Sequence, residues 1–199
     1  MHPNPKFGWP DEAAMRAFVD DTAFAHIVTV ADGRPIGAQA PLVNASDGSV
    51  RFHLSRANRL TALLDGAPVL ASVIGTHFYV SPDWYGTADQ VPTWNYRLVE
   101  IEGVARRLDE AELRDLLDRL SATQEARLAP KPAWATAKMD QARLDAMIRA
   151  ITGFAIEAPR FTGAVKMGQN KPDHETGGVI DALRAIGDTA AADEMERSR

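Results

Sequence analysis

The chain has 199 residues, of which 45% are hydrophobic and 25% charged, the composition of an ordinary soluble globular protein. Its 22 basic and 27 acidic residues give a net charge of −5, which argues against a surface that binds nucleic acid nonspecifically. The absence of cysteine excludes disulfides, a thiolate nucleophile and cysteine-ligated metals. No apolar run approaches the ~20 residues of a membrane span, and the start lacks a signal segment, so we expect a cytoplasmic protein.

The first hundred residues have the pattern of an antiparallel β-meander that follows one short helix. Apolar residues at helical spacing after Pro10 predict a helix over 11–21. Two β-rich runs, 24–30 and 36–43, flank Asp32-Gly33, which is a strong hairpin signal. Further elements are expected as strands at 50–54, 69–74, 77–80 and 91–107, with a short helix at 58–65 ended by Gly66.

Beyond residue 107 the apolar spacing becomes that of helices. Leucines three and four residues apart predict a helix over 108–120, with Asp109 as its N-cap. A second helix is expected over 144–151, then a strand over 154–167 and a last helix over 179–186. These elements predict a mainly β fold with helices packed outside, an α+β barrel or sandwich. We expect a single domain over 1–187 with a helical insertion at about 109–151, and a flexible tail over 188–199.

The segment 52–58 (FHLSRAN) joins a strand to the predicted helix, and it suits an anion. A helix N-terminus offers free backbone N–H groups, and the guanidinium of Arg56 offers a bidentate fork for phosphate. Between residues 33 and 64 four arginines stand against the single acid Asp47, so this stretch carries a charge of +3. The alternative is that Ser55 or Asn58 only caps the helix and Arg56 is solvated. Both interpretations remain open at this point.

Two further segments combine aromatic or cationic side chains with turns. The stretch 77–96 holds six of the fourteen aromatic residues and every tyrosine. It suits a planar heteroaromatic ligand, a subunit contact or a packed core. The stretch 166–172 (KMGQNKP) carries two lysines and two amides that either close a pocket over an anion or lie on the surface. The five histidines show no spacing typical of a metal site, so no metal is expected. The sequence contains none of the common catalytic motifs, so no catalytic residue is assigned.

In their order, the segments 24–41, 52–58, 79–85, 91–96 and 166–170 resemble the PaiB-type FMN-binding negative transcriptional regulators. These belong to the pyridoxamine-phosphate-oxidase-like split-barrel flavoproteins, and the resemblance covers about residues 1–185. It implies a homodimer of six-stranded antiparallel split β-barrels that bind FMN in clefts at the subunit interface. The FMN-binding residues that it implies are Gln39, Pro41, His53, Leu54, Arg56, Asn58, Arg59, Trp94, Asn95, Lys166 and Gln169.

Within that set the resemblance implies distinct roles. The phosphate would lie at 56–59, and the flavin ring would lie along 39–42 and His53, with Trp94 and Asn95 as walls that either subunit supplies. Two positions depart from the family's pattern. Gln39 stands where the family usually has histidine, which puts a histidine-dependent role in doubt. Arg59-Leu60 follows where the family usually has proline, and this change either adds a phosphate ligand or extends the helix.

The family's name implies negative regulation of transcription. However, the predicted helix carries four acids beside Arg114 and Arg119 over 110–120, so direct DNA contact through a basic recognition helix is not expected. One alternative is an FMN-dependent oxidoreductase acting on a small molecule, with His53, Tyr96 or Lys166 as polar partners. A second alternative is a protein that binds haem or another planar ligand.

Overall fold

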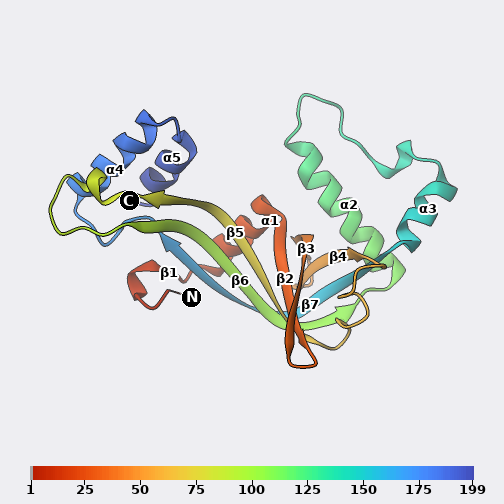
Figure 1. Ribbon diagram of the computed structural model, residues 1–199. Helices are drawn as coiled ribbons and strands as arrows, with labels where there is room; N and C mark the ends of the chain where they lie inside the picture. The colour runs from red at the N-terminus through yellow and green to blue at the C-terminus, as the bar shows by residue number, and fades with distance from the viewer. Residues whose placement is uncertain (1) are drawn as a thin grey trace. The chain divides into compact units, whose positions relative to one another are not determined.

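The computed structural model describes residues 2–199, which form an α+β fold around one antiparallel sheet (Figure 1). The strands are β1 (Gly8–Trp9), β2 (Phe24–Ala31), β3 (Arg34–Asn44), β4 (Val50–Ser55), β5 (Pro68–Val80), β6 (Thr93–Arg107) and β7 (Ile151–Lys166). The helices are α1 (Glu12–Thr22), α2 (Glu110–Ala126), α3 (Gln141–Arg149), α4 (Asp173–Ala185) and α5 (Thr189–Arg197). Three short 3₁₀ turns complete the order: η1 (Pro5–Phe7), η2 (Pro82–Tyr85) and η3 (Thr136–Lys138).

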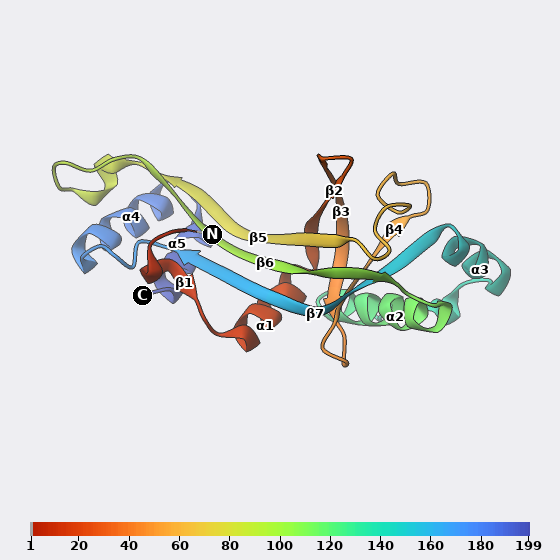
Figure 2. The same ribbon diagram turned by 90° about the horizontal axis from the view of Figure 1, so that it is seen from below.

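The strand order closes the sheet on itself. The order is β1-β7-β4-β3-β2-β5-β6, and β7 also pairs with β6, so the six long strands form a ring. In this ring β5, β6 and β7 are successive neighbours and lie side by side (Figure 2). The predicted six-stranded split barrel is therefore confirmed, with the two-residue β1 added at the edge of β7.

The residues group into two compact units. The first contains the residues up to Glu12 together with Ile74–Val99 and Thr162–Arg199. The second contains Ala13–Val73 and Glu100–Phe161. The single domain expected over 1–187 stays a prediction.

The second unit contains the β2–β3 hairpin that the sequence predicts. Its turn places Asp32 and Gly33 at φ of 51° and 72°, the left-handed conformation that a tight hairpin with strand twist requires. Successive side chains of a strand point to opposite faces. Leu42 and Phe52 are paired and fully buried, and Phe52 stacks on Phe154 with ring centroids 5.5 Å apart inside the barrel.

Helices α2 and α3 cover the outer face of the same strands. The buried residues between them and the sheet are Val43, Leu108, Leu113, Leu116, Leu120, Ile148 and Ala155. Gly153 allows this close approach, since an added Cβ would lie 2.8 Å from Leu108 Cδ1 and 3.0 Å from Leu113 Cδ1. The leucine spacing thus predicted α2 correctly, and α2 packs against β3 and β4.

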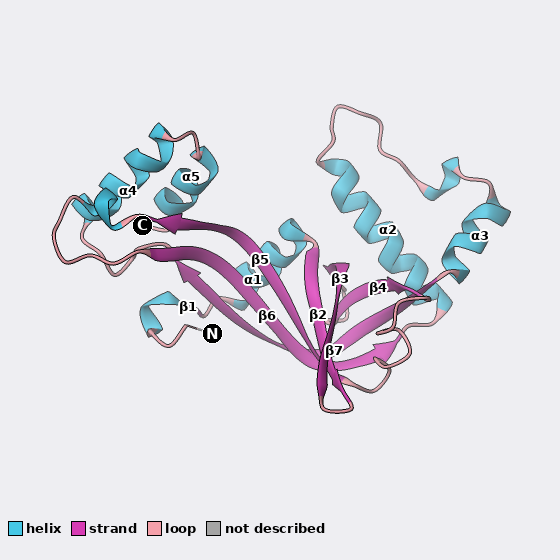
Figure 3. Cartoon of the chain, in the orientation of Figure 1, coloured by secondary structure: helices cyan, strands magenta, loops and turns pink. Residues whose placement is uncertain are grey.

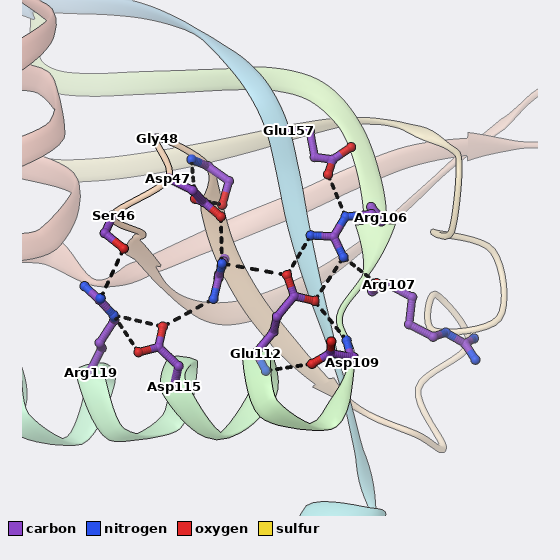
Figure 4. A network of polar contacts seen from close by, with 12 residues as sticks. Ser46, Asp47, Gly48, Arg106, Arg107, Asp109, Glu112, Asp115, Arg119 and Glu157 are labelled. Carbon is purple, nitrogen blue, oxygen red and sulfur yellow. Dashed lines mark hydrogen bonds and ion pairs between the residues drawn. The ribbon is translucent and has the colours of Figure 1, made fainter.

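Charged side chains fix the start of α2 to the barrel (Figure 4). Asp109 caps the helix as predicted, and Glu112 closes a capping box by accepting the Asp109 N–H at 3.0 Å. Glu112 also accepts two hydrogen bonds from Arg106 of β6, at 2.8 and 3.0 Å. Arg106 donates in addition to Glu157 at 2.6 Å. We call Arg106, Asp109 and Glu112 the α2 clamp.

A buried arginine of β4 extends these contacts one turn along the helix. Arg51 donates to Asp47 at 2.7 Å and to Asp115 at 3.2 Å, and it lies 3.8 Å from Glu112. The hydrogen bonds from Arg106 hold the pKa of Glu112 at about 2. Hydrogen bonds from Ser49, followed by Arg51, hold the pKa of Asp47 well below its usual range. These carboxylates therefore stay charged and paired at neutral pH.

In the first unit α4 and α5 pack beside each other (Figure 3). Residues 189–197, expected as part of a flexible tail, form α5 instead. Asp188 caps this helix by accepting the Ala191 N–H at 3.1 Å, and Ala191, Ala192 and Met195 are buried against α4. The buried apolar residues of α5 are mostly alanines, which are small and give only a weak apolar pattern. For this reason the sequence did not indicate a packed helix here.

Four other expectations differ from the structure. Residues 58–65 form successive turns rather than a helix, with Thr61 N–H donating to Asn58 O and Leu63 N–H to Leu60 O. The two strands expected at 69–74 and 77–80 are one strand, β5. Helix α3 ends at Arg149, and α4 begins six residues before the expected position. The turns at 58–65 arise because the Thr61 hydroxyl donates to Ser55 O, which offers the backbone an alternative to a helix.

Candidate functional site

Two cavities of the second unit lie between the outer face of β3–β4 and the helices. The first, which we call the groove, has a volume of about 340 Å³. The second, the chamber, has a volume of about 250 Å³. Both are lined by His53, Leu117, Ser121 and Trp134. The groove adds Ala23, Pro41, Leu120, Gln124 and Glu125, and the chamber adds Thr136, Met139, Leu144, Met147, Ile148 and Ile151.

His53 is a polar residue that lines both of these cavities. It lies on β4 between the buried Phe52 and Leu54, so its ring points to the opposite face, outside the barrel. Its Nδ1 is buried and has no hydrogen-bond partner among residues 2–199. Burial lowers the pKa of His53, so the ring is neutral at pH 7. An unpartnered buried nitrogen is rare in proteins and is a reason to look for a ligand beside it.

Arg56 and Arg59, which we call the arginine corner, follow directly after β4. Arg56 Nη2 donates weakly to Ile151 O at 3.4 Å, and Ile151 lines the chamber. Both guanidinium groups are exposed, and neither pairs with a carboxylate of the described chain, in contrast to Arg51 and Arg106. The corner therefore has positive charge available for an anion.

The local structure of this corner differs from the prediction in one respect. No helix begins at Asn58, so no helix dipole adds to the charge. Asn58 Oδ1 instead accepts the Leu60 N–H at 2.9 Å, and Ser55 Oγ accepts the Ala57 N–H at 3.3 Å. Both side chains thus bond to the backbone of their own loop, and the role of Asn58 in binding phosphate stays a prediction.

The remaining predicted residues of β3 and β4 divide between the two faces of the sheet. Pro41 lines the groove. Gln39 lies two residues earlier on the same face, exposed, with its Nε2 3.1 Å from Nδ1 of His26. Leu54 is buried in the barrel core and does not line either cavity.

In the first unit Trp94 is 55% exposed, and its ring forms an aromatic cluster. The ring centroids of His77 and Tyr79 each lie 6.3 Å away. Lys166 positions the strand beneath, because its Nζ donates to Trp94 O at 2.7 Å and to the Thr93 hydroxyl. Burial lowers the pKa of Lys166. The exposed ring of Trp94 is consistent with a subunit contact, whereas Lys166 is used internally.

Asn95 and Gln169 are also engaged within the first unit. Asn95 is only 2% exposed, and its Nδ2 donates to Met195 Sδ at 3.7 Å. Gln169 Oε1 accepts the Met167 N–H at 2.7 Å, and its Nε2 donates to Val165 O at 2.7 Å. Both side chains hold local structure, and neither is carried into the site proposed below.

The sequence analysis did not identify the helical wall of the cavities. Ser121 and Gln124 continue the leucine stripe of α2 by one turn on the same face, and this change from apolar to polar is the signal that marks them. Trp134 lies in the loop between α2 and α3, where nothing in the local pattern indicates its neighbours. Its backbone N–H donates to Glu125 at 2.8 Å.

Residues 2–199 contain neither a cluster of metal ligands nor a membrane-spanning helix. Nowhere in this part of the chain do three or more His, Asp or Glu side chains gather in a way that would hold a metal ion. None of its helices has the length and apolar composition needed to cross a bilayer.

The sequence and the fold of this chain are similar to those of known proteins. The chain is 29% identical over 171 residues to the protease synthase and sporulation protein PAI 2 of Bacillus subtilis, covering 84% of this chain and 81% of that protein. Two solved structures share the fold. An FAD and heme binding protein from Mycobacterium smegmatis matches with a TM-score of 0.58 and 18% identity, over 90% of this chain and 80% of the other. A flavocytochrome from Azotobacter vinelandii matches with a TM-score of 0.59 and 21% identity, over 83% and 72%.

The family model described as "Putative FMN-binding domain" matches residues 1–160. This match spans the groove, the chamber, the arginine corner and the barrel as far as Arg160 of β7. The resemblance to PaiB-type proteins is confirmed, and FMN is the cofactor that the family indicates. The chain belongs to this family of FMN-binding domains.

Proposed function

We propose that the protein binds FMN with the flavin ring in the groove and the phosphate at the arginine corner. The observation that carries the proposal is the pair of exposed, unpaired guanidinium groups of Arg56 and Arg59 at the end of the strand that carries His53. A phosphate dianion matches this charge, and arginine binds phosphate in bidentate geometry. The groove volume of about 340 Å³ lies within the ~300–1,000 Å³ range of small-molecule sites.

The residues of the groove fit an uncharged ring with hydrogen-bonding edges. Pro41 and Leu117 offer apolar surface, while Ser121 and Gln124 offer polar groups. His53 is neutral, so it offers a hydrogen bond without adding a charge. FMN, when bound, supplies reversible electron or hydride transfer. The chain's own part is to orient the ring, to exclude water from it and to hold the phosphate.

A comparison of FMN with riboflavin tests the phosphate contact directly, because riboflavin lacks the phosphate. We expect the flavin-free protein to bind FMN at least tenfold more tightly than riboflavin, as measured by flavin fluorescence titration. The difference should shrink at high salt, since the arginine corner is exposed and its charge is screened. Equal affinities for the two flavins at low salt would contradict the proposed phosphate site.

The biological role that we propose is regulatory or redox rather than direct DNA binding. The exposed helix α2 carries acids, and Arg114 and Arg119 pair with Glu110 and Asp115 at 2.8 and 2.9 Å, so no free basic face is available there to contact DNA. A second candidate function is that of an FMN-dependent oxidoreductase, because the chamber beside the groove offers space for a small substrate.

The remaining alternative is a protein that binds haem instead of flavin. The absorption spectrum of the bound pigment distinguishes the two.

We also propose that the protein forms a homodimer through the outer face of the second unit. Phe24, Val30 and Val104 are 54%, 63% and 51% exposed. Val30 and Val104 line a separate, shallow depression of about 690 Å³ on the outer surface. Most of the residues that line it are apolar and belong to β2, β5 and β6. Exposed apolar surface of this kind marks a protein contact, and a second copy of the chain is the partner that the family resemblance implies.

The dimer is tested by charging this face. The double variant Phe24→Glu, Val30→Glu is expected to weaken dimerisation at least tenfold, because each substitution buries a carboxylate at the contact. Sedimentation velocity at micromolar concentration measures the change. Leu128→Glu, an equally exposed leucine in the loop after α2, serves as the control and should leave the association unchanged. A monomeric wild-type protein would overturn the proposal.

A further inference from the structure

The chamber differs from the groove in its chemistry. None of its ten lining residues carries a formal charge at neutral pH, because His53 is held neutral by burial. Its polar side-chain groups are the hydroxyls of Ser121 and Thr136, the ring of His53 and the indole N–H of Trp134. Its other walls are aliphatic or methionine side chains. Transfer of a charged group into such surroundings is costly, whereas an apolar ring gains free energy there.

The chamber is also small and adaptable. Its volume of about 250 Å³ falls below the range of drug-sized ligands, which selects a molecule of one or two rings. Met139 and Met147 form part of the wall, and the flexible thioether chain of methionine adjusts to ligands of different shape. Both residues belong to the α2–α3 segment and not to the barrel, Met139 following η3 and Met147 lying on α3.

The position of the chamber connects it to the groove. His53, Leu117, Ser121 and Trp134 line both cavities, so a molecule in the chamber would share these walls with whatever occupies the groove. Trp134 is held in place from its backbone, because Glu125 accepts its N–H at 2.8 Å and also binds Lys131. The loop that carries Trp134 is therefore tied to the end of α2 by Glu125.

We propose that the chamber binds the protein's substrate or effector, an uncharged and largely apolar molecule of one or two rings with a single hydroxyl or carbonyl group. That group would bond to one of the polar side chains of the chamber wall, which are His53, Ser121, Thr136 and the indole of Trp134. The proposal rests on the proposed function, since the flavin in the neighbouring groove would be the partner of this molecule. It adds the ligand class, which the family description does not supply.

Calorimetric titration with 2-naphthol tests the chamber on flavin-free protein. We expect 2-naphthol to bind at least tenfold more tightly than naphthalene-2-sulfonate, which has the same rings and a fixed negative charge. Met139→Trp fills the chamber without lining the groove and should weaken 2-naphthol binding at least tenfold. Met147→Trp is a second filling variant, because Met147 of α3 also lines the chamber. Leu128→Trp, which lines neither cavity, is the matched control.

The same preparations are titrated with FMN, so that the two proposals fail separately. Binding of 2-naphthol that survives in both filling variants, or that the sulfonate equals, overturns the chamber proposal. So does FMN binding with no 2-naphthol binding at all. Binding of 2-naphthol that the filling variants abolish, in a protein that binds no FMN, supports the chamber and overturns the proposed function instead. Circular dichroism shows whether each variant is folded.

Discussion

Replacing both Arg56 and Arg59 with alanine is expected to weaken FMN binding about a hundredfold. Each exposed guanidinium that bonds a phosphate contributes about 1.4 kcal/mol, and two such contributions correspond to a factor of about 100. Riboflavin affinity should stay unchanged, because the substitutions remove only the phosphate contact. Fluorescence titration of the variant with both flavins measures the effect.

The control for this experiment removes the same charge elsewhere. Arg107 and Arg143 are exposed, and no carboxylate of residues 2–199 pairs with them, so Arg107→Ala, Arg143→Ala matches the loss of two positive charges. FMN affinity should change less than threefold in this control. Asn58 is left intact because its side chain holds the loop at Leu60, and its loss would disturb the corner itself. A double Arg56, Arg59 variant that binds FMN as the wild type does would refute the arginine corner.

The fold was predictable where local chemistry decides the structure. Asp32-Gly33 supplies the two left-handed residues that a tight hairpin needs, and Asp109 with Glu112 forms a capping box from positions three apart. In these places a few neighbouring residues contain all of the relevant information. The six-stranded split barrel was expected from the family resemblance and not from any local pattern, and the order of its strands was not predicted.

The candidate site was less predictable, because its walls come from distant segments. His53 and Pro41 are recognisable on adjacent strands, but Trp134 reaches the same cavities from a loop about eighty residues later in the chain than His53. The sequence also does not reveal whether the hydrogen-bond partner of a polar side chain is a ligand or another part of the protein. Asn95 and Gln169 are examples, since Met195 and the backbone near Val165 are their partners.

At the arginine corner the predicted local structure is wrong, while the anion site expected there stays a prediction. The sequence indicates an anion site at 56–59 through a helix N-terminus, yet the chain forms turns there. The difference arises because Ser55 and Asn58 bond to the backbone two residues ahead, which competes with the helix. The charge of the arginines does not depend on that detail, so the functional interpretation remains.

The α2 clamp matters for the site because α2 forms one wall of both cavities. Glu112→Ala is expected to lower the free energy of unfolding by about 2–3 kcal/mol at pH 7. The change removes the capping box and the two hydrogen bonds from Arg106, and it deprives buried Arg51 of a nearby carboxylate. Chemical denaturation measures the loss. Glu110→Ala, an exposed acid in the same turn, is the control and should change stability by less than about 0.5 kcal/mol.

The difference between wild type and Glu112→Ala should depend on pH in a defined direction. The pKa of Glu112 is about 2 in the folded chain, below its ordinary value of 4.5, so the unfolded state binds the proton more readily. The carboxylate's contribution is therefore complete above pH 4.5 and is lost as the pH falls toward 2. We expect the two unfolding free energies to converge over that interval. A difference that stays constant from pH 7 to pH 2.5 would show that lost packing or helix propensity, and not the charged pair with Arg106, holds α2 in place beside the cavities.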